Sequence, residues 1–214
     1  GPVQLYVKGL GRPGDAVVIA HVDGFPVGAA WYRLFKAGKP GYGFVDEKTP
    51  ELAIAVVPSA RGKGVGGALV EALLYDHIQG ALDRAFATLP PADVATQLVH
   101  VAETLYGAYD TRADLSRALL AGTLWASGPD RPLAAQLRTF ESWVTARLAD
   151  ATASGEIPPV SPQLAFVGFF SAYFALLVGG LRGEIPAGAR RPLLEALLRR
   201  ILGLPARPGS EGSP

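Results

Sequence analysis

A glycine-rich run between an apolar segment and a helical pattern has the residue types that bind phosphate groups. It reads VPSARGKGVGGAL over residues 57–69. Glycines lack the Cβ atom that would keep a ligand from the main chain, and the first turn of a helix offers unpaired amide donors and a positive dipole end. We therefore expect this run to bind a diphosphate, with two basic side chains neutralising charge. The predicted cofactor-binding residues are Val56, Val57, Arg61, Gly62, Lys63, Gly64, Val65, Gly66 and Gly67.

Two other phosphate-binding patterns do not fit this run. A Walker loop would place Ser or Thr directly after a Gly-Lys pair, whereas Lys63 is followed by Gly64. A Rossmann fingerprint would require a βαβ unit with a ribose-binding acid, and none follows.

The composition argues against metal and nucleic-acid chemistry. The chain has no cysteine, and its histidines, His21, His77 and His100, have no metal-ligand spacing. The formal net charge of +1 leaves no basic footprint for nucleic acid or an anionic membrane. We therefore expect no metal site and no binding of nucleic acid. No signal peptide opens the sequence, so we expect a cytoplasmic protein.

The pattern of apolar residues changes its period near Gly64. Before it, short β-rich runs predict strands at residues 16–22, 27–35 and 52–57, and Asp23-Gly24 predicts a tight hairpin turn between the first two. After it, apolar residues recur at helical spacing. The predicted helices span residues 65–89, 93–106, 111–126, 131–154, 161–183 and 188–203.

The segment from Leu164 to Leu181 is the most apolar of the chain. Its polar flanks and internal glycines suit a buried bundle helix better than a membrane span, so no membrane association is expected.

The glycine-rich run resembles the Arg/Gln-x-x-Gly-x-Gly/Ala signature of GNAT N-acetyltransferases, which Arg61, Gly64 and Gly66 match. The preceding strand ending at Pro58 and the upstream hairpin also look like that fold. The resemblance implies that loop amides bind the pyrophosphate of acetyl-CoA (or CoA), while main chain at about residues 54–57 pairs with the pantetheine arm. The catalytic residue it implies is Glu51, where some members keep a general base.

Several parts of a complete GNAT domain are missing from the pattern. No further strand, helix with a general acid or closing hairpin follows Leu74, and the residues before Ala16 leave no room for the usual helices. We therefore expect a partial module whose acceptor wall is absent or supplied by something else. An ordinary solvated strand end remains the alternative for Glu51.

From Leu69 to about Leu204 the chain resembles the ligand-binding and dimerisation domain of TetR-family regulators. That resemblance implies a pocket for a small apolar ligand and a homodimer formed by the last two helices. The residues proposed to line the pocket are His100, Tyr106, Trp125, Phe140 and Trp143, and ordinary core packing is the favoured alternative for each of them. The helix-turn-helix head is missing, so DNA binding is not expected.

The expected fold is α+β, with a small antiparallel sheet joined through a shared helix to an all-helical bundle. The predicted domains are a GNAT-like module (1–74), a TetR-like domain (75–204) and a disordered tail (205–214). Two functions follow: an acetyl-CoA-binding acetyltransferase module on a dimeric scaffold, or a non-catalytic small-molecule sensor or dimerisation protein. An engineered chimera is a third interpretation.

Overall fold

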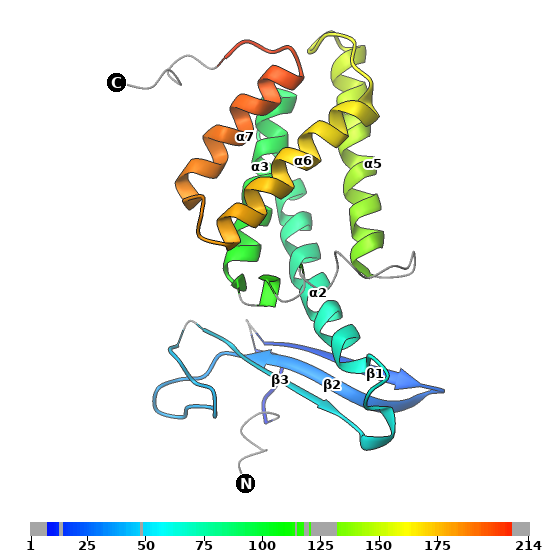
Figure 1. Ribbon diagram of the computed structural model, residues 1–214, viewed down its shortest axis with the longest axis vertical. Helices are drawn as coiled ribbons and strands as arrows, with labels where there is room; N and C mark the ends of the chain where they lie inside the picture. Colours follow the sequence, from blue (N-terminus) through cyan, green and yellow to red (C-terminus); the bar gives the residue numbers. More distant parts are fainter. Residues whose placement is uncertain are drawn as a thin grey trace. The chain divides into compact units, whose positions relative to one another are not determined.

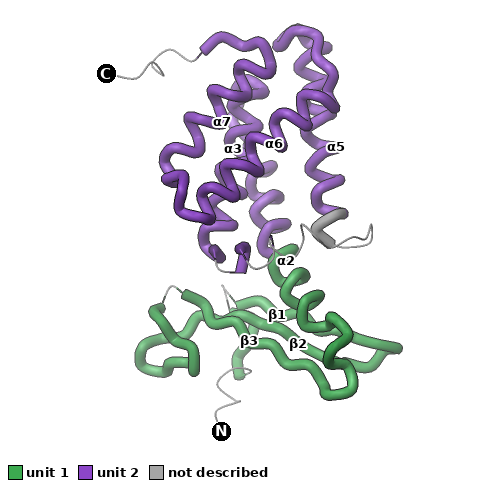
Figure 2. The backbone as a smooth tube through the Cα atoms, in the orientation of Figure 1, with its two compact units in different colours: residues 1–76 green, residues 77–214 purple. Residues whose placement is uncertain are grey.

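The structure, a computed structural model, describes residues 8–12, 15–47, 49–113, 115–117, 120 and 132–206. The chain divides into two compact units, residues 1–76 and residues 77–214, which Figure 2 colours separately. The domain boundary expected after residue 74 lies close to this division. Most of the predicted helix at 111–126, with Trp125, and all of the tail after residue 206 lie outside the described residues.

The first unit contains a three-stranded antiparallel sheet in the order β1-β2-β3 (Figure 1). Its strands are β1 (Ala16–Val22), β2 (Phe25–Arg33) and β3 (Glu51–Val56). Asp23 and Gly24 join the first two strands with φ angles of 50° and 81°. These positive angles are those of the tight hairpin turn that the Asp-Gly pair predicts.

One face of this sheet packs against the helix that follows it. The helix α2 (Val65–Ala87) places Leu69 and Leu73 against Ala30 and Tyr32 of β2, and all four are buried. Gly28 makes the close approach possible, because a Cβ there would lie 3.2 Å from Leu69 Cδ1. The apolar face of the sheet and the start of α2 therefore form one core, which fixes the loop between β3 and α2 at both ends.

The second unit is helical. After α2 come α3 (Val94–Asp110), α5 (Pro132–Ala153), α6 (Pro162–Leu181) and α7 (Ala187–Ile201). Helices α3, α6 and α7 pack on one another, and α5 packs on α3 and α6 (Figure 1). Side chains such as Leu148, Phe169 and Leu194 are fully buried between them.

The helix boundaries follow the capping residues of the sequence. Asp93 accepts a hydrogen bond from Thr96 N at 2.8 Å, and the Ser161 side chain accepts from Leu164 N. Gly155 and Gly183 have φ angles of 74° and 76° just after α5 and α6. Asp and Ser are favoured at N-cap positions, and Gly is favoured just after the end of a helix.

Helix α6 is the one helix of the described residues whose length and apolar composition would allow it to cross a membrane. The share of this segment that is buried within the unit is 44%. Five of its positions are exposed: Gln163, Leu164, Val167, Ser171 and Ala175.

Candidate functional site

The site is built on the connection between β3 and α2. Val57 follows the last residue of β3 and still donates its N–H to Val27 O, at 2.9 Å. Residues Pro58–Ala60 then make a short 3₁₀ turn. Gly62 and Gly64 then have φ angles of 72° and 79°. Only glycine adopts this backbone without strain, so the loop shape depends on both positions.

The amides of residues 62–67 make no hydrogen bond to any part of the chain that the structure describes. The first main-chain bond of the helix is from Ala68 N to Gly64 O, at 3.1 Å. The loop glycines are exposed or half-buried, so solvent or a ligand can reach this part of the main chain. Free amides beside the positive end of a long helix form a binding site for an anion.

Space around the loop is open as well. A Cβ atom added at Gly62, Gly64, Gly66 or Gly67 would meet no other atom within 4 Å. Close packing against the rest of the protein is therefore not what requires glycine at these positions. The two with positive φ are needed for the turn, while Gly66 and Gly67 leave the first turn of α2 bare for a ligand.

Next to the loop, β3 has an edge with which no other strand of the described residues pairs. In an antiparallel pair, residues that exchange main-chain hydrogen bonds alternate with residues whose N–H and C=O point away. Val57 bonds to Val27, and the register then pairs Gly28 with Val56. Hence Val56 and, by alternation, Ile54 and Leu52 direct their main-chain groups toward the free edge.

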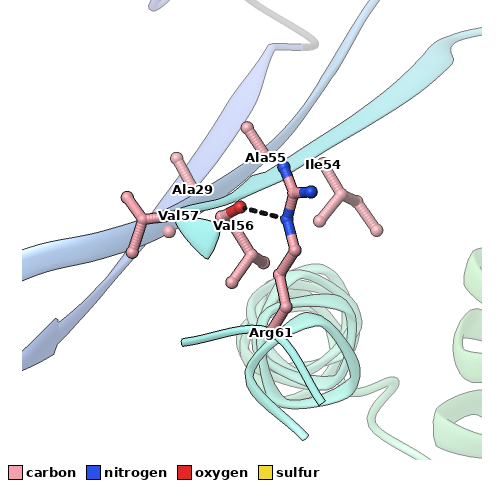
Figure 3. Close-up of a pocket in the computed structure, with 7 residues that line it drawn as sticks. Ala29, Ile54, Ala55, Val56, Val57 and Arg61 are labelled. Atoms are coloured by element: carbon pink, nitrogen blue, oxygen red, sulfur yellow. Dashed lines mark hydrogen bonds between the residues drawn. The ribbon is translucent and has the colours of Figure 1, made fainter. Parts of the chain in front are cut away.

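A hollow of about 630 Å³ lies beside the last residues of β3, where residues of β2, β3 and the loop line it (Figure 3). Its lining residues are Gly28, Ala29, Ile54, Ala55, Val56, Val57 and Arg61. Three of them, Val56, Val57 and Arg61, are among the residues predicted to bind the cofactor. Gly28 and Ala29 were not predicted as site residues, because they belong to β2 and only the strand register brings them beside β3.

The two basic residues of the loop behave differently. Arg61 turns back over the strand, where its Nε donates to Val56 O at 3.0 Å (Figure 3). Lys63 is exposed, and no interaction with the described residues holds it. Together they place two positive charges at the loop.

Glu51 lies at the far end of β3 from the glycine loop. Val56 lies five positions further along the strand, a distance of about 17 Å. Its carboxylate lies against the main chain of Gly41 and Gly43 and is not among the groups that line the hollow. Its role as a general base stays a prediction.

Four of the residues proposed for a ligand pocket lie in two groups of the second unit, and the fifth, Trp125, is outside the described residues. Tyr106 stacks on Tyr173 with ring centroids 5.2 Å apart, and Phe140 lies 6.1 Å from the same ring. The other group is formed by contacts around the end of α2. There His100 Nε2 lies 3.0 Å from Thr88 Oγ1, and Trp143 lies on Phe86 at 4.6 Å.

Two tyrosines of this unit, Tyr106 and Tyr173, are buried, and Tyr109 is half-buried. Burial raises the pKa of Tyr109 to about 12, and it also raises the pKa of Tyr106 and that of Tyr173. The Tyr106 hydroxyl donates to Tyr173 O at 3.0 Å, and Arg190 lies 4.9 Å above its ring. These phenols therefore stay protonated and act as hydrogen-bond donors and packing groups.

No group of three or more potential metal ligands occurs among the residues that the structure describes.

Residues 3–102 match the model of the acetyltransferase (GNAT) family. The match extends past the sheet through α2 and into α3, beyond the predicted boundary at residue 74. It supports an acetyltransferase-like module in the N-terminal part of the chain.

Members of the GNAT family typically bind acetyl-CoA. Neither the comparison with curated proteins nor that with solved structures gave a match. Nothing supports the likeness of residues 75–204 to TetR-family regulators, and that assignment stays a prediction.

Proposed function

We propose that the N-terminal module binds acetyl-CoA and transfers its acetyl group to an amine. The observation that carries this proposal is the set of unbonded amides at residues 62–67, which lies directly beside the unpaired edge of β3. The loop amides suit a diphosphate, and the strand edge suits an extended chain of amide groups. Acetyl-CoA contains both, in this order.

The diphosphate binds at the start of α2. The bare amides of the glycine loop donate to its oxygens, and the helix dipole favours its negative charge. Arg61 and Lys63 add charge-assisted contacts at the rim.

The pantetheine arm then runs along β3 from Val56 toward Glu51. Ile54 offers both its N–H and its C=O at the free edge, so it can pair with an amide of the arm as a neighbouring strand would. The small residues Gly28, Ala29 and Ala55 leave room for the arm in the hollow. This direction carries the thioester away from the loop and toward the start of the strand.

The chemistry is a direct acyl transfer. A neutral amine attacks the thioester carbonyl, a C–N bond forms, the C–S bond breaks, and CoA leaves as a thiol after taking up a proton. The amine must first lose a proton from its ammonium form, and Glu51 is the carboxylate that we propose for this step. Its side chain would have to turn from Gly41 toward the edge of the sheet.

Calorimetric titration with CoA and acetyl-CoA tests the binding proposal. We expect micromolar affinity for both ligands, because their phosphate groups and pantetheine arm are identical. Transfer is then measured as thiol released from acetyl-CoA in the presence of primary amines. Because the chain contains no cysteine, free CoA is the sole thiol in that assay. If the titration detects no binding of CoA at millimolar concentration, the N-terminal module does not bind acyl-CoA and the proposal is refuted.

A second proposal concerns the helical unit, which we infer to form a homodimer through α6 and α7. Helix α6 contains no charged residue over 20 positions. A helix that is apolar all round is stable only when every face is covered. Five of its positions stay exposed in its own unit, and two of these are the large apolar residues Leu164 and Val167, so another surface is needed to cover them.

The uncovered face continues from α6 onto α7. Ile201 lies 3.3 Å from the position of a Cβ at Gly168, so the exposed stripes of the two helices adjoin. The exposed fractions are 73% for Leu164, 57% for Val167, 46% for Leu193, 45% for Leu197 and 38% for Ile201. Two copies related by a two-fold axis would bury these side chains in a four-helix arrangement.

Lipid is a poorer partner for this face. Helix α7 carries Arg190, Arg191, Glu195, Arg199 and Arg200 within 15 residues, so the α6–α7 pair cannot enter a bilayer as a unit.

Light scattering coupled to size-exclusion chromatography measures the assembly. We expect a mass twice that of the 22.4 kDa chain, and a shift to monomer in Leu197→Glu. Leu137→Glu on α5 is the matched control, because Leu137 has a similar exposed fraction, 40%, but does not lie on this face. A monomeric wild-type protein, or equal effects of the two variants, would refute the dimer.

A further inference from the structure

The side chain of Arg61 occupies the strand edge on which the proposed function depends. Its Nε donates to Val56 O at 3.0 Å, and the guanidinium lies over the end of β3 beside Ala55 and Ile54 (Figure 3). Arg61 is itself one of the residues that line the hollow. The arginine therefore serves as more than a diffuse positive charge at the loop.

The acceptor that Arg61 uses is a specific one. Val56 is the last residue of β3, and its carbonyl points to the free edge, as the register with β2 requires. It is also the edge carbonyl nearest to the glycine loop. A pantetheine arm that starts from a diphosphate on the loop meets Val56 O before it meets any other edge carbonyl.

We infer that Arg61 determines ligand specificity by coupling phosphate binding to the opening of the strand edge. In the free protein its Nε–H covers Val56 O. When a diphosphate binds at residues 62–67, the guanidinium moves to the phosphate oxygens, and Val56 O becomes available to an amide N–H of the pantetheine arm. This inference rests on the proposed binding of acetyl-CoA.

The relative strengths of the two hydrogen bonds support this exchange. A guanidinium bonded to phosphate makes charge-assisted and often bidentate contacts, which are roughly twice as strong as contacts with a neutral acceptor. A main-chain carbonyl offers Arg61 a single neutral oxygen. A diphosphate can therefore draw Arg61 away from Val56, whereas a ligand without phosphate must compete with it.

Lys63 provides the contrast within the same loop. It is two residues from Arg61, exposed, and not held by any described residue. Removing its charge should weaken the binding of phosphate-bearing ligands and leave the strand edge unchanged. Arg61→Ala and Lys63→Ala thus separate the loss of charge from the opening of the edge.

The test compares CoA with pantetheine, which has the same arm and no phosphate. Affinities for wild type, Arg61→Ala and Lys63→Ala are measured by calorimetry for CoA, and by the shifts of the Ile54 and Val56 amide resonances for pantetheine. Both alanine variants should bind CoA more weakly. Arg61→Ala alone should bind pantetheine more tightly, by about twofold to tenfold, the range expected when one neutral hydrogen bond no longer competes.

The outcomes separate the inference from the function on which it rests. If wild-type protein does not bind CoA, the proposed function fails, and the inference fails with it. If CoA binds but Arg61→Ala leaves pantetheine affinity unchanged or lowered, Arg61 is only a phosphate ligand and the coupling is refuted. Tighter pantetheine binding in Lys63→Ala as well would trace the effect to loop charge rather than to Val56 O, and would also refute it.

Discussion

Replacing Gly66 with glutamate should abolish most CoA binding without harming the fold. Gly66 is the second residue of α2, its φ is not positive, and a Cβ there meets no atom within 4 Å. The helix therefore accepts a side chain at this position. A carboxylate in the first turn also interacts favourably with the helix dipole, by about 0.3–1 kcal/mol. Stability should not fall, while the anion site acquires a negative charge.

The magnitude follows from the distance between the charges. A carboxylate in the first turn lies roughly 5 Å from a phosphate bound to the same amides, and the Coulomb energy at that distance is about 0.8 kcal/mol with the dielectric constant of water and about 3.3 kcal/mol with an effective value of 20. These energies correspond to a loss of affinity of about 4-fold to 200-fold. The loop is exposed, so each added salt increment should reduce the loss.

Calorimetry with CoA at two salt concentrations measures this loss. Gly188→Glu is the matched control, since Gly188 is the second residue of α7, is exposed and has no atom within 4 Å of its missing Cβ. The control should keep wild-type affinity. If Gly66→Glu binds CoA as tightly as Gly188→Glu while both are folded, the amides of the glycine loop do not hold the phosphates, and the site has been assigned wrongly.

Three further predictions concern the helical unit. Asp93→Ala should lower the free energy of unfolding by about 1–3 kcal/mol in urea titrations, because it removes the cap of α3 and the partner of Arg199 at 2.8 Å; Asp93→Asn, which still caps, should lose less. Leu148→Ala should cost about 2–5 kcal/mol in the same assay, since this side chain is fully buried; a loss below 1 kcal/mol would contradict the packing. The free energy of unfolding should also decrease as the pH is lowered. Burial is the main cause that lowers the pKa of His77 below its ordinary 6.5. In Asp93 burial raises the pKa, but the hydrogen bonds from Thr96 and Arg199 outweigh this effect and lower the pKa. In both groups the pKa of the folded state lies below that of the unfolded state. Their contribution to stability is therefore complete above the unfolded pKa and is lost as the pH falls through the folded pKa, first for His77 and then for Asp93. A urea midpoint of His77→Gln that falls as steeply as that of the wild type between about pH 7 and pH 5 would contradict the role of His77.

Much of the local structure could be predicted from residue types. Asp23-Gly24 forms the tight turn, Asp93 and Ser161 cap their helices, and Gly155 and Gly183 have positive φ after helix ends. Each of these features depends on the conformational preference or side-chain chemistry of one or two residues. Such preferences act over a few neighbouring residues, and a sequence displays them directly.

The candidate site was predictable only in part. The loop from Gly62 to Gly67 was identifiable, because four glycines at the start of a helix leave its first amides open to an anion. The contributions of Gly28 and Ala29 were not, since nothing in their own segment marks them as part of a hollow. The position of the Glu51 carboxylate against Gly41 also depends on a loop conformation that no local pattern predicts.

By itself, the sequence determined the strand-loop-helix unit, its bare amides and the caps of the helices, because these follow from short-range sterics and hydrogen bonding. Only the tertiary structure decided which edge of the sheet stays unpaired, that Val56 O points to that edge, and that Arg61 covers it. Register between strands is a long-range property set by the packing of β2 against α2. A strand that slipped by one residue would turn Val56 O toward β2 and remove the acceptor from the site.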